Sequence, residues 1–237
     1  MRLDKFLCQS TVLDRPTAHE CIISERVKVG RAVITLADTQ VHPEEKVYLD
    51  DVLLKLRPFR YFLIHKPAQT VCSNKDEHYP SVFTSVGLEA ENLHIVGRLD
   101  ADTTGLVLAT DDGQWSFLIM HPDYKCPKTY RVQLQKPIDA VAIEKLEKGI
   151  QLQGEKQATA PAKVEIIHEK EVLLTITEGK FHQVKRMFAA VKNKVVQLHR
   201  ERIGPVELDI AEGDYRALTA AEVRLLVAEK NRPQKKK

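Results

Sequence analysis

The chain has 237 residues, of which 43% are hydrophobic, and this suits one medium domain or a small domain joined to a larger one. A membrane span is excluded because the sequence has no apolar run of sufficient length, and nothing near Met1 resembles a signal peptide. A disulfide framework and a zinc site are also excluded, since the four cysteines are scattered without the required spacing. We therefore expect a soluble cytoplasmic protein with free thiols.

The charge distribution says more about partners than the net charge of +3. Residues 178–202 contain seven basic side chains and two acidic ones. The charged side chains at 125–136 are all basic. The sequence also ends in three lysines. Such clusters favour a polyanionic partner, because each neutralised phosphate releases counterions. The alternative is that they are ordinary solvated faces and a disordered tail.

The first 57 residues have the pattern of a small separate domain. Helical spacing at 3–7 and 18–22 precedes a hairpin at 27–34 and a strand at 47–49. A composition change at Arg57-Pro58 predicts a boundary there. We expect a linker at 58–60, a larger domain at 61–232 and a disordered basic tail at 233–237.

The larger domain mixes strands with sparse helices. We expect strands at 61–64, 105–109, 129–134, 164–166, 172–176 and 195–200, and helices at 114–120, 139–146 and 182–191. A capping box at Thr219 to Glu222 begins a last helix. Strands that pair with near neighbours predict an α+β domain with an antiparallel or mixed sheet.

The most informative segment is Gly97-Arg98-Leu99-Asp100-Ala101-Asp102-Thr103-Thr104-Gly105, a polar loop between apolar runs. One interpretation is a structural turn, in which Asp and Thr bind local backbone groups. A second is the D-x-D-x-T nucleophile loop of a haloacid-dehalogenase-type phosphatase, which would use magnesium. The sequence around the loop argues against it, because the βα repeats of a parallel core are missing.

In a third interpretation, this segment resembles the catalytic motif of pseudouridine synthases, in the branch that modifies small-subunit rRNA and some large-subunit sites. Further matches follow in the family's order at 64–73, 106–115, 128–130 and 178–187. The N-terminal residues Met1 to Phe6 resemble an RNA-binding module shared with a small-subunit ribosomal protein. The resemblance therefore extends from Met1 to about Val227.

The resemblance implies a fold and a reaction. The fold is α+β: a small N-terminal α/β RNA-binding module (alpha-L motif), then a mixed, mainly antiparallel-sheet catalytic domain. The reaction isomerises a uridine to pseudouridine without a cofactor or metal. Segments 98–104, 183–191 and 198–204 most resemble members that act on 16S rRNA, which implies uridine 516 of that RNA as the target.

The implied partner is 16S rRNA or the assembling small ribosomal subunit, bound by a monomer. Two alternatives stay open. One is a synthase of the same branch that modifies a large-subunit uridine, and the other is a non-catalytic RNA-binding assembly factor.

The resemblance also implies roles for individual residues. Asp100 is the catalytic carboxylate, acting as a nucleophile or as a base; Lys185 keeps it ionised, and Tyr130 stacks on the uracil or passes a proton. Asp102 shapes the loop. The expected RNA contacts are Lys66, Arg98, Lys180, His182, Arg186, Arg200 and Arg202. For Arg98, a structural salt bridge with Asp102 or Asp112 is an equal alternative.

Two features depart from the family pattern. Gln69 stands where the first motif usually has glycine, and this restricts the conformations open to that turn. Residues 1–57 contain nine basic and nine acidic side chains, so the surface of this module cannot be uniformly cationic. Any RNA contact there must come from local clustering.

Overall fold

A computed structural model describes residues 1–42 and 44–228, so the expected basic tail at 233–237 lies outside the described residues. The chain forms two compact units. The first unit comprises Met1–Arg60 and Ala90–Leu93, and the second comprises Tyr61–Glu89 and the chain from His94 onward. The first unit thus includes the expected linker at 58–60 and a short segment from the middle of the sequence. No helix in the described part of the chain is long and apolar enough to cross a membrane.

The first unit packs two helices against a four-stranded antiparallel sheet with the strand order β2-β1-β3-β4. Its core contains Leu3, Leu7, Ile22 and Val27, at the spacings that predicted these elements. The two-residue strand β4 was not predicted because it is too short to show a periodicity. The elements are α1 (Leu3–Ser10), α2 (Arg15–Ile23), β1 (Val27–Val29), β2 (Ala32–Val33), β3 (Val47–Leu49) and β4 (Val52–Leu53).

A buried carboxylate organises the helical side of this unit. Asp4 is fully buried and lies 2.9 Å from Arg2 Nη2, 3.1 Å from Arg15 Nη2 and 3.2 Å from His19 Nε2. Burial alone would raise the pKa of Asp4, but hydrogen bonds from Arg2 and His19 lower it to about 2. Although residues 1–57 have no net charge, they contain a local group of basic side chains around Asp4, which we call the Asp4 cluster.

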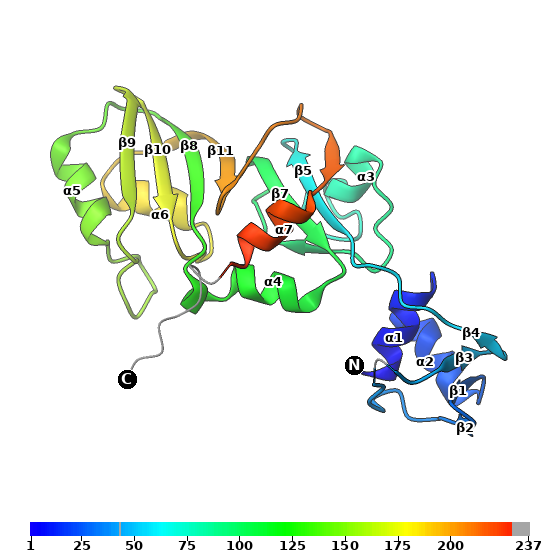
Figure 1. The fold of residues 1–237 in the computed structure, drawn as a ribbon. Coiled ribbons are helices and arrows are strands. Elements are labelled where there is room, and N and C mark those ends of the chain that lie inside the picture. Colours follow the sequence, from blue (N-terminus) through cyan, green and yellow to red (C-terminus); the bar gives the residue numbers. More distant parts are fainter. Residues whose placement is uncertain (43, 229–237) are drawn as a thin grey trace, which may run out of the picture. The chain divides into compact units, whose positions relative to one another are not determined.

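The second unit is built on a nine-stranded mixed sheet with the order β13-β5-β7-β11-β8-β10-β9, in which β6 also pairs with β7 and β12 with β11 (Figure 1). Neighbouring strands are antiparallel except β7 and β11, which confirms the predicted mixed, mainly antiparallel sheet. The strands are β5 (Tyr61–Lys66), β6 (His94–Val96), β7 (Thr104–Thr110), β8 (Lys128–Leu134), β9 (Lys163–His168), β10 (Glu171–Ile176), β11 (Val195–Ile203), β12 (Val206–Glu207) and β13 (Tyr215–Ala217).

The longer helices of this unit begin where the sequence predicted. The side chains of Asp112 and Asp139 cap the helices that follow them, and Thr219 and Glu222 form the predicted capping box. The helices are α3 (Val82–Val86), α4 (Gly113–Met120), the 3-10 turn η1 (Pro122–Tyr124), α5 (Ala140–Lys148), α6 (Gln183–Ala190) and α7 (Ala220–Leu226).

A close approach of β7 and β11 brings the two halves of the large sheet together. Gly105 has a φ of +111°, and a Cβ atom there would collide with the backbone of Arg200. Glycine is therefore required at this position. The loop that ends at Thr103 consequently lies beside β8 and β11, where the expected catalytic side chains gather.

Candidate active site

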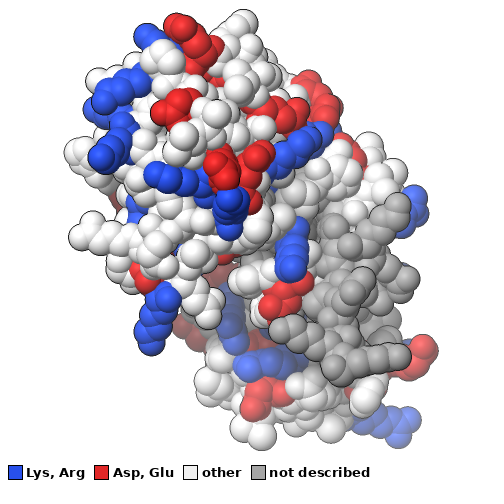
Figure 2. All heavy atoms as spheres, turned by 90° about the vertical axis from the view of Figure 1, so that its left-hand side faces the viewer, with Lys and Arg blue, Asp and Glu red and all other residues white. Residues whose placement is uncertain are grey.

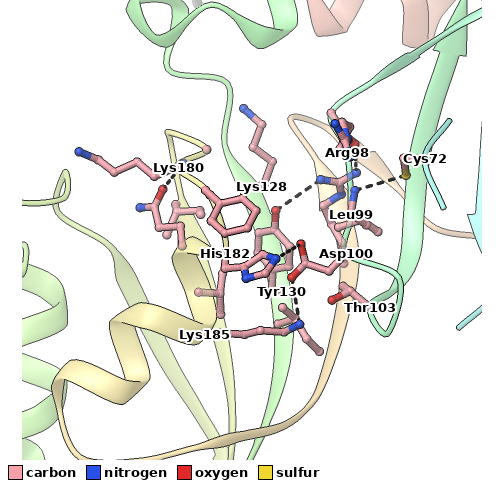
Figure 3. Close-up of a pocket in the computed structure, with 18 of the residues that line it drawn as sticks. Cys72, Arg98, Leu99, Asp100, Thr103, Lys128, Tyr130, Lys180, His182 and Lys185 are labelled. Atoms are coloured by element: carbon pink, nitrogen blue, oxygen red, sulfur yellow. Dashed lines mark hydrogen bonds and ion pairs between the residues drawn. The ribbon is translucent and has the colours of Figure 1, made fainter. Parts of the chain in front are cut away.

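A cavity of about 530 Å³ lies where the loop before β7 meets β8, β11 and the segment between β10 and α6 (Figure 3). Its lining includes Asp100, Tyr130 and Lys185, which are separated in sequence but were expected to act together. Of the expected RNA contacts, four also line this cavity: Arg98, Lys180, His182 and Arg200. Lys66, Arg186 and Arg202 do not.

The loop that carries Asp100 is held through its backbone. The ammonium of Lys66 donates to the carbonyl oxygens of Ala101 (3.2 Å) and Thr103 (2.9 Å). The backbone N–H of Gln69 donates to the same Ala101 oxygen at 2.8 Å. These bonds fix the loop on both sides of Asp102, so the position of the Asp100 carboxylate is set by the fold.

Lys66, which was expected to contact RNA, faces the interior of the second unit in this structure. Its side chain is fully buried, and burial lowers its pKa. Its ammonium donates hydrogen bonds to the main-chain carbonyl oxygens of Pro67, Ala101 and Thr103. Lys66 therefore holds the loop that carries Asp100 through its backbone.

Gln69 adopts the left-handed conformation, with a φ of 58°. This is the backbone region that glycine enters without a steric penalty, and other residues enter it at a cost of about 1 kcal/mol. Gln69 thus occupies a backbone conformation that favours glycine, and we expect this to lower the stability of the fold.

One lysine is shared by two carboxylates at the cavity. Lys185 Nζ lies 2.9 Å from Asp100 Oδ2 and 2.6 Å from Asp102 Oδ1. Burial lowers the pKa of Lys185, but its hydrogen bonds to Asp102 and Asp100 outweigh this effect and the pKa is raised. Burial raises the pKa of Asp102, but the hydrogen bond and the charge of Lys185 outweigh this effect and lower the pKa overall. Lys185 and Asp102 therefore both carry charge at neutral pH.

The Asp100 carboxylate is partly open. Its side chain is 26% exposed, and its second oxygen, Oδ1, lies 3.4 Å from His182 Nε2 (Figure 3). Asp102 is much more exposed, at 73%. Asp102 was expected only to shape the loop, and the structure adds a direct ion pair with Lys185.

Arg200 lines the cavity and forms hydrogen bonds with three of the segments around it. Its guanidinium donates to the carbonyl oxygens of Leu106 and Gly97, at 2.7 Å each, and to the hydroxyl of Tyr130 at 3.4 Å. The side chain is 2% exposed. Arg200, which was expected to contact RNA, directs its donors to the backbone at Gly97 and Leu106 and to Tyr130 in this structure.

The other expected RNA contacts have mixed surroundings. Arg98 is exposed, and within residues 1–42 and 44–228 neither Asp102 nor Asp112 pairs with it. Arg186 and Lys180 both pair with Glu155, at 2.9 and 3.6 Å. Arg202 pairs with Glu207 and lines a separate cavity of about 400 Å³.

Two of the four basic side chains at 125–136 are engaged within the fold, whereas Lys125 and Lys136 are exposed. Lys128 is buried and donates to the carbonyl oxygen of Cys126 at 2.9 Å. Arg131 pairs with Glu171 and Glu201 on the neighbouring strands. Figure 2 shows a face of the molecule on which Lys and Arg side chains are interspersed with Asp and Glu.

Comparison with known proteins decides between the interpretations of the loop. The family model described as RNA pseudouridylate synthase matches residues 60–190, which is more than half of the chain. The chain belongs to this family. It is therefore a pseudouridine synthase, an isomerase, and the phosphatase interpretation is wrong. The structure gives the reason: Asp100 follows β6, which is antiparallel to β7, so no parallel βα unit presents it.

Relatives within the family cover almost the whole chain. The "Ribosomal small subunit pseudouridine synthase A" of Haemophilus influenzae is 46% identical over 231 residues, which is 96% of this chain and 100% of the relative. The protein of the same name from Escherichia coli K12 is 47% identical with the same coverage. A solved structure described as "Crystal structure of pseudouridylate synthase" is 45% identical, with a TM-score of 0.70, and covers 96% of this chain and 100% of its own.

One residue of this pseudouridylate synthase cavity was missed. Phe181 lies inside the third sequence motif, but an apolar residue before a predicted helix usually indicates core packing. The structure leaves Phe181 75% exposed at the cavity. Neither hydropathy nor spacing distinguishes an exposed aromatic side chain from a buried one.

Proposed function

We propose that this pseudouridine synthase acts on 16S rRNA of the small ribosomal subunit, with uridine 516 as its target and Asp100 as its catalytic carboxylate. Its relatives of 46–47% identity carry the name of small-subunit synthases. The observation that carries the proposal is the Asp100 carboxylate, which is 26% exposed at the cavity and lies 2.9 Å from Lys185 Nζ. We further propose that the protein acts as a monomer.

The reaction needs an ionised carboxylate close to the sugar of the uridine. The bond between N1 of uracil and C1′ of ribose breaks, the base turns, and a bond forms between C5 and C1′. The proton on C5 leaves, and N1 gains a proton. Asp100 attacks C1′ as a nucleophile or removes a proton from the sugar to give a glycal-like species. Either route requires the uridine to be flipped out of its stack, which costs a few kcal/mol.

The groups around Asp100 support this assignment. Lys185 supplies a positive charge next to the carboxylate, and an adjacent cation favours the ionised form of an acid. Tyr130 is buried in the cavity wall, and its hydroxyl accepts a hydrogen bond from Arg200. Its ring can stack on the uracil.

We propose fewer RNA-contacting residues at the cavity than the sequence suggested. Arg98 and His182 remain candidates at the cavity, because both side chains are exposed there. In the first unit, Arg2, Arg15 and His19 are held together around Asp4, and they are the residues we propose for RNA contact.

A conversion assay tests the proposal. Transcribed 16S rRNA and small-subunit particles, both lacking pseudouridine, are incubated with the protein, and pseudouridine is mapped by chemical derivatisation. We expect one new pseudouridine, at uridine 516, in at least one of the two substrates. Conversion of large-subunit rRNA alone would transfer the proposal to that RNA, and the absence of conversion on every rRNA would reject it. Mapping rRNA from cells that lack the protein gives an independent reading.

A further inference from the structure

An exposed aromatic ring borders the catalytic cavity. Phe181 lies between β10 and α6, lines the cavity next to His182, and is 75% exposed. Single exposed apolar residues are common on protein surfaces, so exposure alone does not identify a binding site. The contacts of Phe181 with its neighbours distinguish it from such residues.

The backbone around Phe181 is fixed by charged and polar side chains. Arg186 Nη1 donates to the carbonyl oxygen of Phe181 at 2.9 Å and pairs with Glu155 at the same distance. The buried Gln183 accepts from the N–H of Lys180 at 2.8 Å and donates to Glu178 at 2.7 Å. The segment thus holds Phe181 in a defined position, and this explains why Arg186 is turned toward the protein.

One face of the ring is covered and the other is open. The Phe181 ring stacks on the imidazole of His182, with ring centroids 3.8 Å apart and planes inclined by 21°. His182 Nε2 in turn lies 3.4 Å from Asp100 Oδ1. Since the side chain is 75% exposed despite this stacking, its opposite face is accessible to solvent. A flat apolar surface therefore stands one side chain away from the carboxylate.

We propose that the open face of Phe181 stacks on an RNA base next to the flipped uridine and so holds that nucleotide over Asp100. This inference rests on the proposed function. Every nucleobase has a π face, and aromatic platforms hold unpaired RNA bases in this way. The target uracil is assigned to Tyr130, which is buried in the cavity wall, so the base that meets Phe181 at the exposed edge is a neighbour.

Substitutions at Phe181 separate stacking from simple apolar contact. In the conversion assay, Phe181→Ala is expected to lower kcat/KM about tenfold, mainly through a higher KM, because one base-aromatic stack is lost. Phe181→Trp should retain wild-type values, whereas Phe181→Leu should resemble Phe181→Ala. The matched control is Ile166→Ala on β9, which removes another exposed apolar side chain, 59% accessible, and should change nothing.

A double-mutant cycle identifies the base. Each nucleotide beside the target uridine is replaced in turn by an abasic one, and conversion and RNA affinity are measured with wild type and Phe181→Ala. At one position, the abasic RNA should weaken wild type about tenfold and Phe181→Ala no further. Wild-type activity from Phe181→Ala, or purely additive effects at every neighbour, would overturn the inference. If wild type converts no RNA, the proposed function fails, and the affinity cycle still decides whether Phe181 stacks on a base.

Discussion

The two units each place a carboxylate among basic side chains, but the two sites differ in how much of the carboxylate is open. Asp4 is fully buried and contacts Arg2, Arg15 and His19, and the backbone N–H of Lys5 donates to it at 2.8 Å. Asp100 is 26% exposed, and its partners are Lys185 and His182.

This difference separates a structural carboxylate from a reactive one. The Asp4 oxygens are occupied on all sides, so the charge holds α1 and α2 together and is not accessible to a substrate. The Asp100 carboxylate keeps one side on the cavity. Basic side chains lie beside the carboxylate in both places, and exposure is what distinguishes the carboxylate proposed to act on a substrate.

Among the tests of this difference between the two carboxylates, the largest effect is expected on the activity of Lys185 variants. Lys185→Met removes the cation that both Asp100 and Asp102 contact, and it should lower kcat for rRNA conversion by about a hundredfold, as when a preorganised charge partner is removed from an active site. Lys185→Arg keeps the charge and should retain more of the rate. Equal rates for Lys185→Met and wild type would show that Asp100 needs no cation.

In the first unit, Asp4→Asn should reduce stability while leaving the second unit intact. The pKa of Asp4 in the folded protein is about 2, below its ordinary value of 3.8, so ionised Asp4 stabilises the fold by about 2 kcal/mol above pH 4. This contribution is lost as the pH falls from 4 toward 2. Hydrogen exchange of the α1 amides measures it. The stabilities of wild type and variant should converge on acidification, and a constant difference over this range would contradict the assignment.

A smaller effect is expected at Asp102. Asp102→Asn removes one of the two carboxylates that share Lys185, but the 2.9 Å contact with Asp100 remains. Turnover should fall by only a few fold, because an exposed ion pair contributes on the order of 1 kcal/mol or less. A loss as complete as that caused by removing Asp100 would assign Asp102 a catalytic part.

The smallest effect is expected at Gln69. Gln69→Gly relieves the left-handed backbone conformation and should raise the free energy of unfolding by up to about 1 kcal/mol. Urea denaturation monitored through Trp115, in the second unit, measures this change. Destabilisation by the glycine would mean that the Gln69 side chain itself supports the loop.

Sequence patterns predicted the long elements, and the family resemblance implied the grouping of Asp100, Tyr130 and Lys185. The helices capped by Asp112, Asp139 and Thr219 carry their start signals within a few residues. The short elements β4, β6, β12, β13 and α3 were not predicted, since two to five residues show little periodicity. Local pattern therefore sufficed for elements that carry their own start signals or a clear periodicity.

The burial and the ion pairs of side chains could not be predicted where residues distant in sequence create them. A lysine at the end of a strand is usually exposed, and Lys66 is buried only because the loop at 101–103 offers it carbonyl oxygens. Arg200 is buried because β7 and β11 approach closely at Gly105. Lys185 and Asp102, 83 residues apart, likewise meet only in the folded chain.

The most direct measurement compares Asp100→Asn with Asp102→Asn in the conversion of unmodified 16S rRNA, with pseudouridine mapped at each uridine. Asn in place of Asp100 removes the ionised oxygen but little volume, so RNA affinity and folding should be nearly unchanged. We predict no pseudouridine from Asp100→Asn and clear conversion by Asp102→Asn. Near-normal turnover by Asp100→Asn would contradict it.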